Sequence, residues 1–322
     1  MGIRLIKNTI KENSMAKFYM VVGIPGCGKS TWAETNKDKL NIVVHSSDAI
    51  REELGDVNDQ SKNTDVFQIL HTRIKDDLRS GKNVVYDATN LNRNRRIAFL
   101  NELKNIPCEK VCVLFATPWE MCLARNYARD RHVPEDVMVR MYKNFQTPWF
   151  NEGWDDIQIV WANYDNMLGY DYDICADIEE WKELSHDNPH HSLSIGDHML
   201  EAGSHMRKRT NDSKLIMAAL MHDCGKPDTK AFIDSHGNHC DVAHFYQHHC
   251  VGSYLSLFYL RKAFPFWEEE DMLYVSLLIN LHMNPFLSWD QSEKAKEKEI
   301  KLFGNKVIAD VELLHECDKL AH

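Results

Sequence analysis

The stretch GIPGCGKST, residues 23–31, constrains the fold of this chain more than any other feature. It has the Gly-x4-Gly-Lys-Ser spacing of a phosphate-binding loop and directly follows the apolar run FYMVV. Such a loop joins a buried strand to a helix, and its backbone N–H groups surround phosphate oxygens. Lys29 is expected to contact the β- and γ-phosphates and the Ser30 hydroxyl to ligate Mg²⁺. The sequence therefore predicts a site for ATP or another nucleoside triphosphate with Mg²⁺, built from Gly23, Gly26, Gly28, Lys29, Ser30 and Thr31.

The hydrophobic pattern changes along the chain. The β-branched runs FYMVVG, NIVVH, NVVYDA, KVCVLFA and IQIVWA all precede residue 163 and alternate with helix-length segments, which is typical of a parallel sheet with crossover helices. After residue 185 the apolar residues recur at spacings of three and four, which predicts helices only. We therefore expect an α/β domain and an all-α domain that couple weakly. The expected boundaries are a tail at 1–14, the α/β domain at 15–165, a linker at 166–185 and the helical domain at 186–322.

Candidate acceptor-binding residues follow the run NIVVH. Ligands of open parallel sheets bind at the carboxyl ends of the strands, and the sequence puts Asp48 and Arg51 at that edge. A carboxylate there can take the proton of an acceptor hydroxyl, and an arginine can bind an acceptor phosphate. The alternative is that Asp48 only caps the following helix.

Further polar residues follow the later runs. Asp87 and Thr89 come at the end of the third run. They precede three arginines that are either substrate contacts or a solvated charge run: Arg93, Arg95 and Arg96. Arg125 and Arg129 lie four residues apart, so one helix face can bring both over the nucleotide phosphates and offset charge in the transition state. An exposed amphipathic helix is the alternative for that segment.

With these features the first half resembles the 5′-hydroxyl polynucleotide kinases of the P-loop class. The resemblance spans residues 17–150 and rests on five elements in order: GIPGCGKSTW, the Asp-x-x-Arg at Asp48, TNLN from Thr89, the Arg-Asn-x2-Arg at Arg125, and VP…MYK. It implies that Asp48 is the general base, that Lys29 and Arg129 act on the donor phosphates and that Arg51 binds the 3′-side phosphate of the acceptor. The substrate contacts that it suggests are Arg51, Asp87, Thr89, Asn90 and Arg96.

The second half has ionisable residues on apolar helix stripes. His198 shares a stripe with Met199 and Met206, and Asp318 shares one with Leu314. Burying a carboxylate without a partner is costly, so Asp318 requires a cation. Adjacent side chains on a helix diverge by only about 100°, so His222 and Asp223, which end the run ALMHD, can both turn toward one ion. An ordinary core position is the alternative for each histidine. The set predicts a transition-metal site for Mn²⁺, Ni²⁺, Co²⁺ or a similar ion, with the ligands His198, His222, Asp223 and Asp318.

The order His, His-Asp, Asp around HDCGKP resembles the HD superfamily of metal-dependent phosphohydrolases over residues 186–322. The resemblance implies an all-helical fold and a hydrolytic metal centre in which Asp223 is catalytic. His248 and His282 match positions that some family members use for a second metal or for phosphate. Lys226 either contacts substrate phosphate or caps a helix end. His190 and His191 are alternatives to His198 as the first ligand: all three lie in the stretch NPHHSLSIGDHML.

Together the two resemblances predict a bifunctional enzyme that heals broken nucleic-acid ends, RNA rather than DNA. The first domain would phosphorylate a 5′-hydroxyl, and the second would remove a 2′,3′-cyclic phosphate or phosphate, so that an RNA ligase can join the ends. The order of the domains is the reverse of that in the known bifunctional kinase–HD enzymes. The alternatives are a small-molecule or nucleoside kinase fused to a nucleotidase or a phosphohydrolase of signalling nucleotides, and a non-catalytic regulator.

Composition indicates the cellular setting. The nine cysteines are scattered without a Cys-x-x-Cys pair, which favours a reducing cytoplasm. No apolar stretch approaches the roughly 20 residues that cross a bilayer, so no membrane association is expected. The net charge of −10 argues against sequence-blind binding along nucleic acid, and any nucleic-acid contact should therefore be local.

Overall fold

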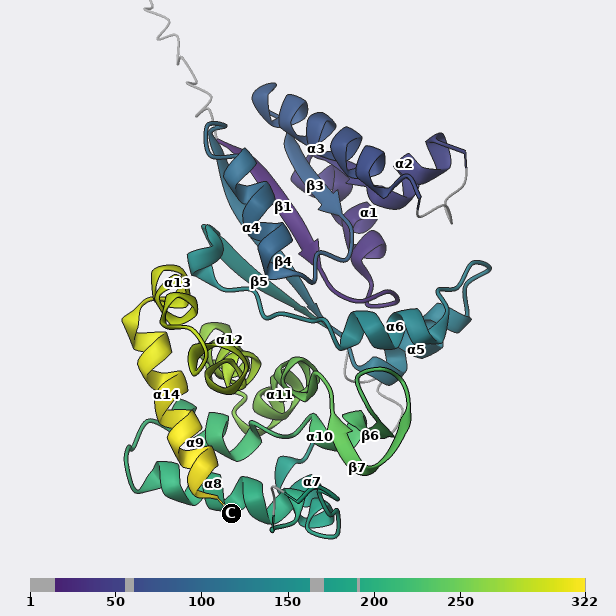
Figure 1. Ribbon diagram of the computed structural model, residues 1–322. Coiled ribbons are helices and arrows are strands. Elements are labelled where there is room, and N and C mark those ends of the chain that lie inside the picture. The colour runs from purple at the N-terminus through teal and green to yellow at the C-terminus, as the bar shows by residue number, and fades with distance from the viewer. Residues whose placement is uncertain (1–14, 56–60, 163–170, 190–191, 322) are drawn as a thin grey trace, which may run out of the picture.

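The computed structural model describes residues 15–55, 61–162, 171–189 and 192–321. Its first half contains a sheet of five parallel strands in the order β2-β3-β1-β4-β5. The strands are β1 (Ala16–Val22), β2 (Ile42–Ser46), β3 (Asn83–Asp87), β4 (Cys108–Ala116) and β5 (Asp156–Trp161). They coincide with the five β-branched runs, so the predicted parallel α/β architecture is confirmed (Figure 1). Their carboxyl ends meet at one edge of the sheet, where the candidate residues of the first half gather.

Helices connect these strands. They are α1 (Lys29–Leu40), α2 (Ser47–Glu53), α3 (Asn63–Arg79), α4 (Arg93–Glu102), α5 (Trp119–Tyr127), α6 (Glu135–Tyr142) and the short 3-10 helix η1 (Phe150–Glu152). The longest, α3, buries a stripe of residues at spacings of four: Val66, Leu70, Ile74 and Leu78. Such a stripe fixes which face of the helix meets the sheet.

The second half is mainly helical. Its helices are α7 (Ile174–Trp181), α8 (Ile195–Arg207), α9 (Ser213–Met221), α10 (Lys226–Thr229), α11 (His248–Ala263), α12 (Glu269–Leu281), the π-helix η3 (Pro285–Trp289), α13 (Glu293–Phe303) and α14 (Asn305–Leu320). The expectation of helices only was wrong at one place. Strands β6 (Lys230–Ile233) and β7 (His239–Phe245) form an antiparallel hairpin. Its turn contains Gly237 at φ 87° and is closed by the N–H of Asp234 donating to the carbonyl of Asn238.

The segment expected to be a linker contains helix α7. Ile174 and Ile178 of this helix are buried, and so is Tyr172 just before it. A Cβ on Gly196 of α8 would lie 2.4 Å from the carbonyl oxygen of Ile178, so the absence of a side chain there allows α7 and α8 to approach closely. Part of the chain between the sheet and α7, residues 163–170, lies outside the described residues, as does the expected tail at 1–14.

The two halves pack against each other through one continuous hydrophobic core, which runs from the sheet into α11 and α12 (Figure 1). Buried polar contacts also cross the boundary. Arg93 donates to the side chain of Asn280 at 3.0 Å, and the hydroxyls of Thr147 and Ser276 lie 2.8 Å apart. The side chain of Glu269 accepts a hydrogen bond from the N–H of Ile159 on β5, the edge strand of the sheet. The two halves thus share a core and buried hydrogen bonds, whereas the sequence predicted domains that couple weakly. In the part of the chain that the structure describes, no helix is both long and apolar enough to span a bilayer.

Candidate nucleotide site and candidate metal centre

The phosphate-binding loop connects β1 to α1. Gly26 and Gly28 have φ angles of 83° and 105°, which side-chain-bearing residues rarely adopt. A Cβ on Gly26 would also lie 2.2 Å from the carbonyl oxygen of Cys122, so both backbone angle and space require glycine there. Lys29 begins α1 with its ammonium inside the loop, 2.9 Å from the carbonyl oxygen of Gly23 and 2.8 Å from that of Ile24. The loop therefore brings together the N-terminus of α1, the backbone N–H groups of the glycines and the ammonium of Lys29, which are the groups that bind phosphate.

Asp87 lies next to the serine of this loop. The Ser30 hydroxyl donates to its Oδ2 at 3.0 Å, and Asp87 is buried at the end of β3. Burial raises the pKa of Asp87, and Lys29 and the Ser30 hydroxyl oppose that shift. The structure thus puts Asp87 beside the hydroxyl expected to bind Mg²⁺, whereas the sequence had suggested a contact with the acceptor.

Asp48 is exposed in the first turn of α2. It does not cap this helix, because the side chain of Ser46 does so by accepting a hydrogen bond from the N–H of Asp48. Its carboxylate accepts a hydrogen bond from Arg51 at 2.9 Å and lies 3.7 Å from the guanidinium of Arg131. Arg51 is buried and also donates to Asn63, while its Nε has no hydrogen-bond partner among the described residues. Asp48 and Arg51 thus form a pair at the carboxyl edge of the sheet, and Arg131 is a neighbour that the sequence pattern did not single out.

Arg96 does not belong to this edge. Its side chain is fully buried and paired with Glu152 at 2.6 Å, and it donates to the backbone carbonyls of Asn90 and Leu91. The prediction that Arg96 binds substrate was therefore wrong, because its guanidinium is already enclosed by protein acceptors. Neighbouring Arg93 is buried too, so a solvated charge run is also wrong for these two arginines.

Two residues of the TNLN segment, Thr89 and Asn90, make structural contacts. Asn90, at φ 49°, donates through its amide to the carbonyl of Val21 on β1, and the carbonyl of Thr89 accepts from the N–H of Gly23. These contacts join the end of β3 to the phosphate-binding loop. Asn90 and Thr89 therefore shape the loop rather than standing apart as substrate contacts.

A cavity of about 610 Å³ extends from the loop to the end of β5, and Arg125 and Arg129 both line it. The two arginines do not share one helix face as expected, because α5 ends at Tyr127 and Arg129 follows in the turn. Thr117, at the end of β4, lines the same cavity, and its hydroxyl donates to the carbonyl of Cys27 in the loop. No motif in the sequence pointed to Thr117.

The second half brings together all six residues predicted as metal ligands. They come from five elements that are far apart in the sequence: His198 from α8, His222 and Asp223 from the end of α9, His248 from α11, His282 from the end of α12 and Asp318 from α14. All six are buried. His190 and His191, the alternatives for the first ligand, lie outside the described residues.

The four histidines share one orientation. Each ring has its Nδ1 next to a backbone carbonyl: Ala321 for His198, Ala219 for His222, Phe245 for His248 and Ile279 for His282, at 2.6–2.8 Å. A carbonyl can only accept, so Nδ1 carries the proton and each neutral ring presents the Nε2 lone pair. Those nitrogens point toward one another in pairs, 3.1 Å apart in His198–His222 and in His248–His282. Nε2 atoms this close repel each other as bare lone pairs, so a shared proton or a cation must lie between them, and with the rings neutral these residues fit a metal.

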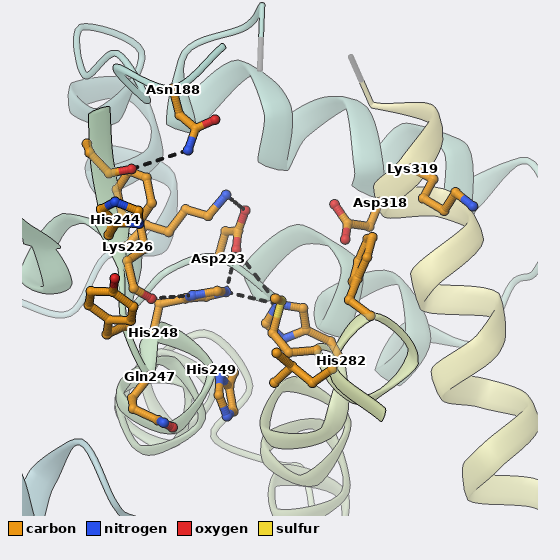
Figure 2. Close-up of a pocket in the computed structure, with 16 residues that line it drawn as sticks. Asn188, Asp223, Lys226, His244, Gln247, His248, His249, His282, Asp318 and Lys319 are labelled. Carbon is orange, nitrogen blue, oxygen red and sulfur yellow. Dashed lines mark hydrogen bonds and ion pairs between the residues drawn. The ribbon is translucent and has the colours of Figure 1, made fainter. Parts of the chain in front are cut away.

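Asp223 joins the two histidine pairs. Its Oδ2 lies 3.2 Å from His198 Nε2 and 3.3 Å from His222 Nε2. Its Oδ1 lies 3.2 Å from His248 Nε2 (Figure 2). Asp318 completes the first pair at 3.1 Å from His198 Nε2. The donors therefore divide into two groups that could each hold an ion, with Asp223 between them.

The buried charges of this cluster affect one another strongly. Burial by itself would raise the pKa of Asp223, but His222 and Lys226 bring it well below its usual range. Burial would likewise lower the pKa of His222, but Asp223 and Asp318 raise it to about 10. Two carboxylates thus draw positive charge into an apolar interior, which a metal cation would supply.

Lys226 reaches the cluster from the first turn of α10. Its ammonium lies 2.7 Å from Asp223 Oδ2 and 3.1 Å from Nε2 of His186. Burial and the neighbouring Lys226 lower the pKa of His186 to about 4. The sequence did not point to His186, because it lies in a loop without helical periodicity. Lys226 faces a cavity of about 640 Å³ beside the cluster, which Lys319 also lines (Figure 2).

Known proteins resemble mainly the first half. Residues 18–148 match the family described as an AAA domain. An L-seryl-tRNA(Sec) kinase of Methanococcus maripaludis is 28% identical over 141 residues, which are 42% of this chain and 55% of that protein. The chain thus spans about half the length of this relative.

Two solved structures also align with the chain. A structure of the Pnkp1/Rnl/Hen1 RNA repair complex aligns with 40% of this chain and 44% of its own, at 20% identity and a TM-score of 0.36. A structure of the Pnkp1/Rnl/Hen1 complex aligns with 49% of each chain at 21% identity and a TM-score of 0.33. The match to an AAA domain, the parallel sheet and the loop at Gly23–Thr31 all concern the first half and agree on an α/β domain with a phosphate-binding loop.

Proposed function

We propose that this protein is a bifunctional end-healing enzyme that phosphorylates 5′-hydroxyl ends of nucleic acid and removes terminal phosphoesters, RNA being favoured over DNA. The observation that carries the second activity is the convergence of four histidine Nε2 atoms and two carboxylates in a buried cluster. The first activity rests on the loop with Lys29 and Ser30 and on the carboxylate of Asp48 at the same sheet edge.

In the kinase reaction, Asp48 takes the proton of the acceptor hydroxyl as its oxygen bonds to the γ-phosphorus of ATP. The bond from that phosphorus to the β–γ bridging oxygen breaks, and ADP leaves. Lys29, Arg125 and Arg129 offset the negative charge on the transferring group. Arg51, whose Nε has no described partner, would bind a phosphate of the acceptor.

Asp87 has a supporting part in this reaction. Its carboxylate accepts from the Ser30 hydroxyl, and Ser30 would bind the Mg²⁺ that accompanies ATP. The name of the relative from Methanococcus maripaludis favours a kinase and suggests a second acceptor class, a hydroxyl carried by an aminoacylated tRNA.

In the second half, His198, His222 and Asp318 would hold one divalent transition metal and His248 and His282 another, with Asp223 shared between them. This would be the metal centre of an HD-type phosphohydrolase domain at residues 186–322. When bound, such ions activate water and stabilise negative charge on a phosphoester. Lys226, held by Asp223 and His186, would contact a phosphate of the substrate.

The cavity beside this cluster suits a nucleotide. Lys226 and Lys319 both line it, and the walls also include Tyr246, Phe286 and Met283. Cationic groups beside aromatic walls match a phosphate attached to a base, whereas inorganic phosphate would need no apolar wall. A 2′,3′-cyclic phosphate at an RNA end and a free nucleotide both have this chemistry, so the substrates must be compared directly.

An acceptor panel and an ester panel test the proposal. The purified protein is given ATP with 5′-hydroxyl RNA, 5′-hydroxyl DNA, nucleosides or seryl-tRNA, and separately 2′,3′-cyclic-phosphate RNA or free nucleotides with Mn²⁺, Ni²⁺ or Co²⁺. We expect 5′-hydroxyl RNA and cyclic-phosphate RNA to react best. Lys29→Ala should abolish only phosphate transfer, and the double change His222→Ala, Asp223→Ala only ester hydrolysis. Turnover of nucleosides and free nucleotides alone would instead identify a small-molecule kinase fused to a nucleotidase.

A further inference from the structure

We propose that the helical half builds the nucleoside-binding end of the nucleotide site. Trp161 would be the surface against which the donor base stacks, and Glu269 and Arg261 would be positioning residues that hold it. The inference rests on the binding of a nucleoside triphosphate at the loop, which is part of the proposed kinase function. It adds that the affinity for the nucleoside depends on residues outside the P-loop domain.

The shape of the cavity sets where a nucleoside can go. At one end lie Gly26 and Gly28 of the phosphate-binding loop, and at the other lie Trp161 and Ala162 at the end of β5. Because the loop binds phosphates, the rest of the 610 Å³ must receive the sugar and base. Of the aromatic side chains that line it, Trp161 is the one at the strand end opposite the loop. Aromatic rings of this kind stack on any base, because every base has a π-face.

Residues of the helical half contact Trp161 on several sides. Its indole N–H donates to Glu269 Oε1 of α12 at 2.7 Å. The guanidinium of Arg261 of α11 lies 4.2 Å from the ring centroid, and Phe258 packs edge-on at 6.5 Å. Glu269 also accepts from the backbone N–H of Ile159 through Oε2, so one carboxylate fixes both the strand and the ring. The indole thus has one set position while it still lines the cavity.

The same helix supports the phosphate end. Tyr254, seven residues before Arg261 on α11, bonds to the backbone of Thr117. The hydroxyl of Thr117 in turn donates to the carbonyl of Cys27 in the loop. Helix α11 therefore reaches the nucleotide cavity at two places, which a helix that merely covered the sheet would not need.

Comparing the affinities for two ligands distinguishes binding of the base from binding of the phosphates. ATP and inorganic tripolyphosphate share the phosphate chain, but only ATP has a base and sugar. In the full chain we expect Trp161→Ala to weaken ATP binding about 10-fold and to leave tripolyphosphate binding within about twofold, as loss of one stacking contact predicts. Trp161→Phe should retain most of the affinity. GTP and CTP should lose about as much as ATP, because stacking does not select the base. Trp267→Ala, which removes a half-buried tryptophan that does not line the cavity, is the matched control and should change neither affinity.

A double-mutant comparison tests the positioning residue. Glu269→Ala should weaken ATP binding several-fold with Trp161 present and have a smaller effect in the Trp161→Phe background, since phenylalanine has no indole N–H to hold and only the bond to Ile159 is then lost. Glu270→Ala, the exposed neighbour, should have no effect in either background. Equal losses for ATP and tripolyphosphate in Trp161→Ala would overturn the inference. If the wild type bound neither ligand, the proposed nucleotide site itself would fail instead.

Discussion

The hydroxyl of Tyr254 accepts a hydrogen bond from the backbone N–H of Thr117 at 3.0 Å and donates one to its carbonyl at 2.8 Å. Tyr254 belongs to α11, whose first residue is the candidate metal ligand His248, and Thr117 follows strand β4 beside the nucleotide cavity. Six helical residues at 1.5 Å each separate Tyr254 from His248, about 9 Å along the axis. One rigid helix thus links the two candidate sites.

Removing that hydroxyl should destabilise the protein. We expect Tyr254→Phe to lower the free energy of unfolding by about 1–3 kcal/mol, because the N–H of Thr117 would be left buried without its partner. Chemical denaturation measures the change. Tyr127→Phe is the matched control: that ring is exposed and its hydroxyl bonds only to Glu135 at the surface, so its effect should stay below about 0.5 kcal/mol. Similar effects for the two variants would mean that the interface contact is not a buried one.

The general base can be tested apart from ATP binding. Asp48→Asn should reduce phosphate transfer to a 5′-hydroxyl by about 10² to 10⁴, because an amide cannot take the proton of the hydroxyl. The affinity for ATP should remain, since Lys29 and not Asp48 lies in the loop. Single-turnover transfer and equilibrium ATP binding are the two measurements. Wild-type transfer in this variant would refute the role of Asp48.

The acceptor clamp makes a distinct prediction. Arg51→Ala should impair acceptors that carry a 3′-side phosphate about 10-fold more than acceptors that end in a 3′-hydroxyl, because the guanidinium would contact that phosphate. The measurement is kcat/KM for pairs of short 5′-hydroxyl oligonucleotides and matching nucleosides. Arg73→Ala removes an exposed arginine of α3 that is paired with Glu53, and it should affect both acceptors equally. An equal loss for both acceptors in Arg51→Ala would exclude the clamp.

Metal content tests the shared carboxylate. His282→Ala should lower the bound transition metal by about one ion per chain and leave the other, because His198, His222 and Asp318 form a separate group. Asp223→Ala should remove both, since both groups depend on its two oxygens. Elemental analysis of protein purified with Mn²⁺ or Ni²⁺ gives the stoichiometry. His205→Ala, which pairs only with Glu201 near the surface, should keep the full amount. A full content of bound metal in Asp223→Ala would mean that His222 and Asp223 have a structural role and do not bind metal.

The buried pair of Arg96 and Glu152 predicts a loss of stability rather than of substrate binding. Arg96→Ala should cost about 3–5 kcal/mol, because the buried carboxylate of Glu152 would keep only its longer ion pair, 3.4 Å to Arg93. Arg73→Ala breaks an exposed pair of the same kind and should cost less than about 1 kcal/mol. Thermal or chemical unfolding compares the two. A small effect in Arg96→Ala would mean that solvent reaches Glu152.

The sequence predicted the sheet well because parallel strands are buried on both faces and so appear as continuous β-branched runs, as in β1 and β4. It also indicated the six residues that the structure brings together. Four of them followed from burial, because two ionisable residues on apolar stripes and a His-Asp doublet need a cation, whereas His248 and His282 followed only from the family resemblance. The prediction of site residues failed where a residue's environment is set by contacts with distant parts of the chain. The sequence just before Arg96 is polar and gives no sign that its side chain is buried. Its burial depends on Glu152, which is distant in the sequence. His186 and Thr117 lie in irregular segments, where periodicity gives no information.

The covering of β5 by the helical half has a practical consequence for dissecting the protein. β5 is an edge strand, and an uncovered edge strand pairs readily with the edges of other molecules. A fragment that stops near residue 165 would lose Glu269 and the rings of Tyr254 and Phe258, and would expose both the strand edge and the apolar face beneath α11. We therefore expect the isolated P-loop fragment to self-associate or aggregate when expressed alone, while the full chain with an inactivated metal centre stays monodisperse. Assigning the kinase to one half is thus better done with point variants of the whole chain than by truncation.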